Sequence, residues 1–188
     1  MTTTDTKQTI LDAARKVVQA RGYNALSFRE LAKDVGIKSA SIHYHFPTKG
    51  DLGAALARRY TEDAMGYFDQ LLVASQDPAS VIRDYTAVFR AALENGNRMC
   101  LCGIMAAEHH DLPPEVQAEV AGFTNANVQW LSRVLALKQP DAQPEALGAR
   151  ALSILAAIQG AQLVSRGRND IAAYDQMIES YRAVGLIP

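Results

Sequence analysis

The chain has 188 residues, of which 48% are hydrophobic and 21% are charged, and its formal net charge is −1. This hydrophobic content is ordinary for a globular protein and too high for a disordered one, and the length suffices for one or two domains with a buried core. The two cysteines, Cys100 and Cys102, lie too close in sequence to form a disulfide framework.

Charge is distributed unevenly along the chain. Residues 1–50 contain eight Lys and Arg against four Asp and Glu, a net charge of +4, which leaves −5 on the remainder. This asymmetry predicts a basic segment that contacts nucleic acid. The N-terminus has no apolar signal-peptide core, and the longest nearly apolar run, 151–164, is shorter than the roughly 20 residues that span a bilayer. We therefore expect a soluble cytoplasmic protein without a membrane partner.

The first predicted elements are helices. Apolar residues with a 3.6-residue period predict a helix over about residues 7–21, and Gly22 ends it. A second helix is predicted to begin at Ser27, because Ser27 and Glu30 have the spacing of a capping box. It should end at Gly36, since glycine accepts the left-handed backbone of a helix stop.

A third short helix is predicted directly after this turn. Ser39 is its expected N-cap, Pro47 stops it, and Ile42 and Phe46, one turn apart, should face the core. Two short helices around a glycine turn are typical of a helix-turn-helix, with an αα-hairpin of merely polar face as the alternative. The outward residues are small or form hydrogen bonds, as in a recognition helix: Lys38, Ser39, Ala40, Ser41, His43, Tyr44 and His45.

Residues 8–53 resemble the TetR/AcrR family of bacterial transcriptional regulators. The run YHFPTKGDL, residues 44–52, is highly specific to that family, whereas His43 stands where the family usually has Tyr. The resemblance implies an all-α fold with a helix-turn-helix DNA-binding domain over 1–50 and an effector-binding and dimerisation domain over 51–188. The matching residues are Ile10, Ala13, Ala14, Gly22, Ser27, Arg29, Leu31, Ala32, Gly36, Ile37, Ser39, Ile42, Tyr44, His45, Phe46, Lys49 and Leu52.

The resemblance implies a ligand-responsive regulator without enzymatic activity or cofactor. We expect a repressor that binds a palindromic operator in double-stranded DNA as a homodimer and is released by a small effector. A ligand-independent DNA-binding activator is the alternative within this class. We expect Arg29, Ser39 and Ala40 to meet base edges, and Ser27, Ser41, His43, Tyr44 and Lys49 to hold phosphates, with Lys38 beside them.

The rest of the chain is predicted to consist of further helices, over about 48–72, 78–95, 99–110, 114–137, 145–165 and 171–184. The helix over 145–165 is apolar almost all round, so it must be buried on more than one side. Either a subunit interface or the core of a monomer would bury it, and the family resemblance favours the dimer. The expected dimer-interface residues are Leu152, Leu155, Ile158, Gln162, Tyr174 and Met177.

The central region contains apolar, aromatic and thiol side chains that suit either a core or a ligand cavity. Cys100 and Cys102 could be buried packing residues, sensor thiols, or the nucleophile of a thiol-dependent enzyme that uses His109. Their spacing matches no structural zinc site, so we expect no metal. The residues expected to bind or sense the effector are Tyr67, Tyr85, Phe89, Cys100, Cys102, Met105, His109, Phe123 and Trp130.

Overall fold

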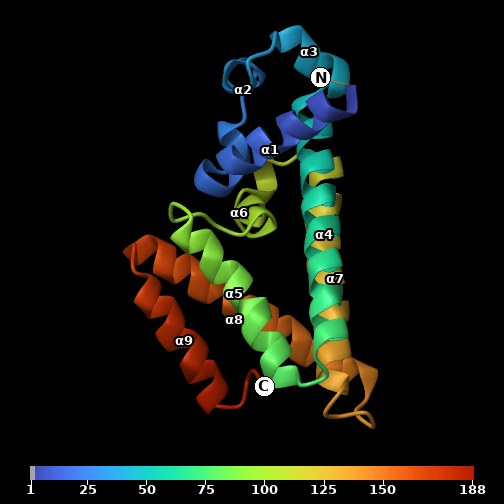
Figure 1. The fold of residues 1–188 in the computed structure, drawn as a ribbon, viewed down its shortest axis with the longest axis vertical. Coiled ribbons are helices and arrows are strands. Elements are labelled where there is room, and N and C mark those ends of the chain that lie inside the picture. Colours follow the sequence, from blue (N-terminus) through green and yellow to red (C-terminus); the bar gives the residue numbers. More distant parts are fainter. Residues whose placement is uncertain (1–2) are drawn as a thin grey trace. The chain divides into compact units, whose positions relative to one another are not determined.

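The computed structural model describes residues 3–188, which form helices joined by short loops and contain no β-strand (Figure 1). The predicted all-α fold is thereby confirmed. Two short 3-10 turns, η1 (Tyr23–Ala25) and η2 (His109–Asp111), interrupt the series. The α-helices are α1 (Thr3–Arg21), α2 (Phe28–Val35), α3 (Ser39–His45), α4 (Lys49–Ala74), α5 (Pro78–Glu94), α6 (Leu101–Ala107), α7 (Pro114–Ala136), α8 (Pro144–Arg168) and α9 (Ile171–Ala183).

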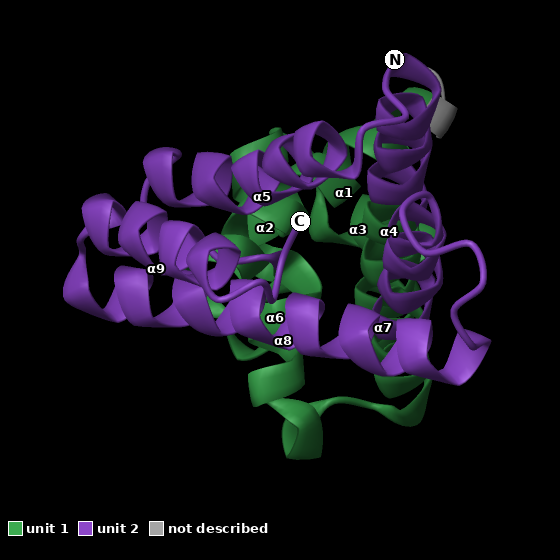
Figure 2. Cartoon of the chain, turned by 90° about the horizontal axis from the view of Figure 1, so that it is seen from below, with its two compact units in different colours: residues 1–61, 101–123 green, residues 62–100, 124–188 purple. Residues whose placement is uncertain are grey.

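The chain divides into two compact units (Figure 2). Unit 1 is Met1–Thr61 with Leu101–Phe123, and unit 2 is Glu62–Cys100 with Thr124–Pro188. The sequence predicts two contiguous domains instead, because nothing in its pattern indicates that α6 packs against α1. Helices α4 and α7 each begin in unit 1 and end in unit 2.

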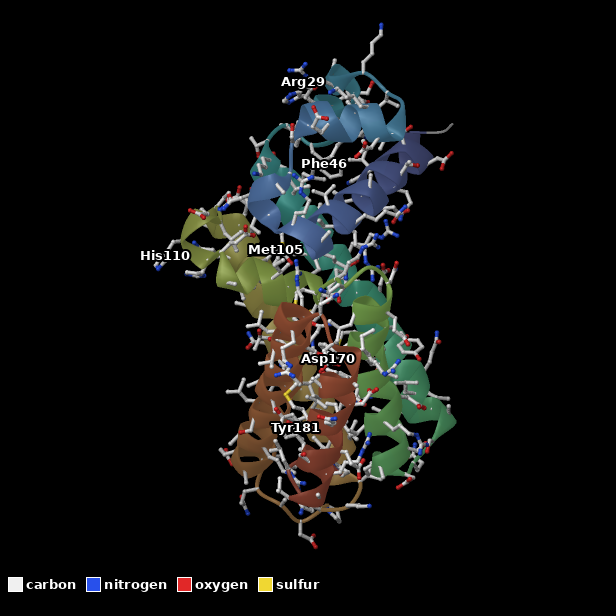
Figure 3. All side chains as sticks on the ribbon, turned by 90° about the vertical axis from the view of Figure 1, so that its left-hand side faces the viewer. Arg29, Phe46, Met105, His110, Asp170 and Tyr181 are labelled. Atoms are coloured by element: carbon white, nitrogen blue, oxygen red, sulfur yellow. The ribbon has the colours of Figure 1, made fainter. Side chains whose placement is uncertain are left out.

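Unit 1 has an apolar core formed by short helices. Ile10 of α1, Leu31 of α2 and Ile42 of α3 are buried, as are Phe46 after α3 and Leu52 of α4. Figure 3 shows the Phe46 side chain directed into this part of the fold. The inward pair Ile42 and Phe46 lies as its helical spacing predicts, so the polar residues of α3 are left on the opposite side.

The ends of α2 follow the local signals in the sequence. Ser27 is the N-cap, and its hydroxyl accepts a hydrogen bond from the backbone N–H of Glu30. The Glu30 carboxylate binds Lys33 at 2.8 Å, so its side chain takes part in an exposed ion pair rather than in a reciprocal capping box. Gly36 ends the helix at φ 75°, and the N–H of Ile37 donates to the Ala32 carbonyl at 2.9 Å.

The caps of the next two helices differ from one another. The prediction that Ser39 caps α3 is wrong, because Lys38 occupies the N-cap position without a side-chain hydrogen bond and Ser39 is the first helical residue. A reciprocal capping box is present at the start of α4. The Thr48 hydroxyl accepts from the Asp51 N–H at 3.0 Å, and the Asp51 carboxylate accepts from the Thr48 N–H at 3.0 Å.

Unit 2 contains α5, α8 and α9, which pack against one another, together with the later parts of α4 and α7. Helix α5 begins after Asp77, whose carboxylate accepts from the N–H groups of Ala79 and Ser80. Helix α9 begins after Asp170, which caps it in the same way. Aspartate at an N-cap satisfies orphan N–H groups, so both helices start where the sequence predicts.

Helix α8 is longer than the apolar run noted in the sequence. It has 25 residues and contains an 18-residue window of mean hydropathy 1.4, so by length and composition alone it could cross a membrane. The expectation of an apolar stretch too short for a bilayer therefore does not hold for the whole helix. Core helices of soluble proteins have the same composition, and α8 packs against both α5 and α9.

Candidate nucleic-acid interface and candidate ligand site

The outward side of the helix-turn-helix is formed by α3 and the start of α2. Arg29, Lys38, Ala40, His43 and Tyr44 are exposed, and the Tyr44 side chain reaches 77% exposure. Figure 3 shows Arg29 at the outer surface of unit 1. The other predicted DNA-binding residues are half-buried: Ser27, Ser39, Ser41 and Lys49. An exposed tyrosine of this size beside the exposed cations Arg29 and Lys38 is a surface suited to a polyanion.

His43 is held in one orientation by two neighbours. Its ring packs edge-on against Phe28 with centroids 4.8 Å apart, and its Nδ1 lies 3.3 Å from the Pro47 carbonyl oxygen. When Nδ1 donates its proton to that carbonyl, the neutral ring presents Nε2 as an acceptor. A phosphate contact by His43 therefore requires the doubly protonated imidazolium.

Lys49 is directed towards its own unit. Its Nζ donates to the Asn24 carbonyl at 3.2 Å and lies 4.5 Å from the centre of the Tyr23 ring. Partial burial lowers the pKa of Lys49, and the nearby Glu108 carboxylate opposes that shift. A phosphate would have to compete with these contacts, so Lys49 is less accessible to DNA in this conformation than Lys38.

Glu108 is a contact residue that sequence reasoning missed. Its carboxylate accepts hydrogen bonds from the backbone N–H of Tyr23 at 2.5 Å and of Asn24 at 3.4 Å, and Asp111 binds the Asn24 amide at 2.7 Å. Gly22, at φ 85°, leaves room for this carboxylate, because a Cβ there would lie 2.5 Å from it. Glu108 thus fixes the turn that leads into α2. No local signal reveals a partner 85 residues away.

Similarity to known proteins agrees with this geometry. The family profile described as "Bacterial regulatory proteins, tetR family" matches residues 10–56. The structure of a TetR transcriptional regulator from Legionella pneumophila superposes with a TM-score of 0.88 and 29% sequence identity, over 97% of both chains. The chain belongs to the TetR family of transcriptional regulators. A TetR-family regulator from Agrobacterium tumefaciens superposes with a TM-score of 0.85 and 28% identity, over 94% of this chain and 95% of that one.

Similarity to a curated relative covers only part of the chain. IcaR, the negative transcriptional regulator of the biofilm operon icaADBC in Staphylococcus epidermidis, is 30% identical over 71 residues. The match covers 38% of this chain and 36% of IcaR. The similarity therefore covers little more than a third of either protein, and it carries no information on a ligand.

The residues predicted to bind an effector are divided between the two units. Cys102, Met105, His109 and Phe123 belong to unit 1, whereas Tyr67, Tyr85, Phe89, Cys100 and Trp130 belong to unit 2. Within unit 2 the Tyr85 and Trp130 rings stack with centroids 5.2 Å apart, and the Phe68 ring contacts both. These three side chains are buried, so they pack as an aromatic core.

Polar groups inside unit 2 are mostly satisfied by specific partners. The Tyr85 hydroxyl donates to Asn127 Oδ1 at 2.9 Å, and burial raises the pKa of Tyr85 well above its usual value. Gln162 accepts from the Cys100 N–H at 2.9 Å and donates to the Phe89 carbonyl at 2.8 Å. The Trp130 Nε1–H is buried without a hydrogen-bond partner. Gln162, predicted at the dimer interface, is therefore a buried residue of α8 that binds the backbone at Cys100 and at Phe89.

The other predicted interface residues also divide into two groups. Leu155, Ile158 and Tyr174 are buried within the single chain, with at most 2% exposure, whereas Leu152 is 51% exposed and Met177 is half-buried. An uncovered stripe runs along α8 at helical spacing, and it consists of small and apolar residues: Ala149, Leu152, Ala156, Gly160, Leu163 and Val164. This stripe, rather than Leu155 and Ile158, is the surface available to another subunit.

Cys100 and Cys102 are both buried, at 2% and 1% exposure. A thiolate must be solvated or stabilised to react, and a buried apolar setting raises the pKa of a thiol. We therefore expect native protein to react with a thiol-specific alkylating reagent at least about tenfold more slowly than urea-unfolded protein. Quenched alkylation followed by mass spectrometry measures both rates. If either thiol of the native protein reacted at the rate of the unfolded protein, the expected protection would be contradicted and a sensor thiol would be supported.

Proposed function

We propose that this TetR-family regulator is a homodimeric repressor that binds a palindromic operator and is released by a small effector. The observation that carries the proposal is the exposed face of α3 in a helix-turn-helix whose inner face is fully packed. Arg29, Ser39 and Ala40 face base edges, while Lys38, Ser41 and Tyr44 contact phosphates.

The stripe on α8 supports the homodimer. Ala156 and Gly160 are small enough to let a second helix approach closely, and Leu152 and Leu163 on either side supply apolar area. Related by a two-fold axis, two such stripes face each other and bury side chains that a monomer leaves in water. A dimer also supplies two recognition helices, which matches the two half-sites of a palindrome.

Release by an effector requires a conformational preference and nothing more. In one conformation of the dimer the spacing of the two α3 helices matches successive major grooves, and in the other it does not. An effector that binds the second conformation more tightly lowers operator affinity. The size of the effect is set by the ratio of its affinities for the two conformations. Helices α4 and α7 each contribute residues to both units, so a change in unit 2 reaches unit 1 through continuous helix.

Selection of duplexes from a random library by the full-length protein tests the DNA-binding proposal. We expect enrichment of an inverted repeat whose half-sites are about 10 base pairs apart, centre to centre, or a multiple of this spacing. Enrichment of no sequence, or of a single unrepeated half-site, would contradict the proposed dimeric repressor.

Variants of the helix-turn-helix separate base contacts from phosphate contacts. On the selected duplex, Arg29→Ala should cost about 1–3 kcal/mol and relax sequence preference at one position. Lys38→Ala should weaken all duplexes alike and lower the salt slope by about one unit. Fluorescence anisotropy over a series of salt concentrations measures both effects.

Lys33→Ala is the matched control for these two variants. Lys33 is exposed, as Arg29 and Lys38 are, but it is paired with Glu30 at 2.8 Å. It should leave the affinity and the salt slope unchanged. Equal losses in all three variants would show that the effect is one of net charge, and would refute the assigned contacts.

A further inference from the structure

A groove in unit 2 lies between α5 and α9 and has a volume of about 420 Å³, within the range of small-molecule sites. Its floor is mainly apolar, with the Tyr174 ring, Ile178 and Ala87. The Tyr174 hydroxyl is turned inward and donates to the Thr86 carbonyl at 2.8 Å, so the ring is fixed in place. The groove therefore offers a rigid apolar surface rather than a polar one.

The rim of the groove carries charges of both signs. Arg83, Arg90 and Arg182 line it together with the carboxylates of Asp175 and Glu179. Arg90 is fully engaged: its Nε and Nη2 donate to Asp175 at 2.8 and 3.0 Å, and it also binds Glu94.

The other two arginines are less committed than Arg90. Arg83 donates to the Ser80 hydroxyl at 2.9 Å, and its nearest carboxylate oxygen, on Asp84, is 3.9 Å away. Arg182 makes one contact of 3.3 Å with Glu179. These two guanidinium groups come from opposite walls, Arg83 from α5 and Arg182 from α9. Guanidinium groups with unused donors are well suited to bind a carboxylate.

The groove also lies on a different side of α9 from the proposed dimer surface. With 100° of rotation per residue, Asp175 in the groove and Met177 lie about 200° apart around the helix. A subunit that covers the Met177 side and the stripe on α8 leaves the groove open.

We propose that this groove binds a small amphipathic monocarboxylate. The apolar tail lies on Tyr174 and Ile178, and the carboxylate accepts hydrogen bonds from Arg83 and Arg182. The single negative charge of the carboxylate accepts from two guanidinium groups with unused donors, whereas a dianionic phosphate would be repelled more strongly by Asp175 and Glu179. This site goes beyond the proposed repressor function and is independent of DNA binding.

Isothermal titration of the full-length protein, without DNA, with sodium octanoate and with the uncharged octan-1-ol tests the proposal. We expect one octanoate per chain, bound at least about tenfold more tightly than octanol, because the guanidinium contacts are charge-assisted. Equal binding of the two probes, or no binding of octanoate at millimolar concentration, would overturn the proposal.

Substitutions in the rim and the floor locate the site. The double variant R83Q/R182Q should lose at least about tenfold in octanoate affinity, and E179Q should gain affinity because it releases Arg182 and removes a repelling charge. Ala87→Phe should abolish binding, since Ala87 is exposed in the groove and a ring there fills it without disturbing the core.

Arg133→Gln is the matched control, because Arg133 is an exposed arginine of unit 2 that pairs with Asp69 outside the groove. It should bind octanoate as the wild type does. Far-ultraviolet circular dichroism verifies that each variant is folded. Unchanged affinity in folded R83Q/R182Q or in folded Ala87→Phe would place the octanoate elsewhere and overturn the proposal.

Discussion

Replacing Leu163 by Glu should yield a folded monomer that has lost tight operator binding. Leu163 is 58% exposed in the single chain, so the substitution disturbs no core contact. In the proposed dimer it lies in the stripe on α8, and the two-fold axis places two new carboxylates in the interface. An unpaired buried charge costs about 3–5 kcal/mol, so dissociation follows. Loss of the second recognition helix lowers operator affinity by roughly 10²–10⁴-fold.

Two further variants give this experiment its controls. Val73→Glu makes the same kind of change at an 87% exposed position near the end of α4, and this variant should remain dimeric and bind the operator. Leu155→Glu should unfold unit 2 instead, because Leu155 is 2% exposed within one chain. Light scattering at micromolar concentration gives the mass, and circular dichroism gives the helicity. A dimeric Leu163→Glu protein would rule out this face of α8.

The contrast between Leu155 and Leu163 shows where sequence reasoning about α8 stops. The helix is apolar on nearly every side, so its periodicity contains no signal that separates the face packed against α5 and α9 from the face left uncovered. Gln162 was misplaced for the opposite reason. A glutamine in an apolar helix suggests a surface, yet both ends of the Gln162 amide are satisfied inside by Cys100 and Phe89.

Features governed by neighbouring residues were predictable to within a few positions. Gly22, Gly36, Asp77 and Asp170 mark helix ends through backbone conformation or capping, which depend on the local sequence alone. The inward direction of Ile42 follows from the same kind of local spacing. The family-specific run around Tyr44 likewise located the helix-turn-helix, because that motif is compact and continuous in sequence.

Features governed by distant residues were not predictable from the sequence. Lys49 looks free for a phosphate in the sequence, but its ammonium group contacts the Tyr23 ring and Asn24, and Glu108 fixes the same turn from far along the chain. The sequence therefore locates the DNA-binding residues best, because they lie in one compact local motif. Those of the central region, which depend on how helices pack, divide between the two units instead.

The packing of the aromatic residues of unit 2 as a core has a measurable consequence at Trp130. Its side chain is 2% exposed, stacks on Tyr85 and contacts Phe68 at 5.1 Å between centroids. In such a packed core Trp130→Ala leaves a void that the neighbouring rings cannot fill, and substitutions of this kind cost about 3–5 kcal/mol. For a marginally stable protein that is a large share of the free energy of unfolding.

Trp130→Phe separates packing from hydrogen bonding at this position. The Nε1–H has no partner to lose, so phenylalanine gives up only part of the ring volume and should cost less than half as much as alanine. Trp130 is the single tryptophan, and urea unfolding of all three proteins must therefore be followed by circular dichroism. A Trp130→Ala cost below about 1 kcal/mol would mean that the ring borders open space, and the effector site would then belong here.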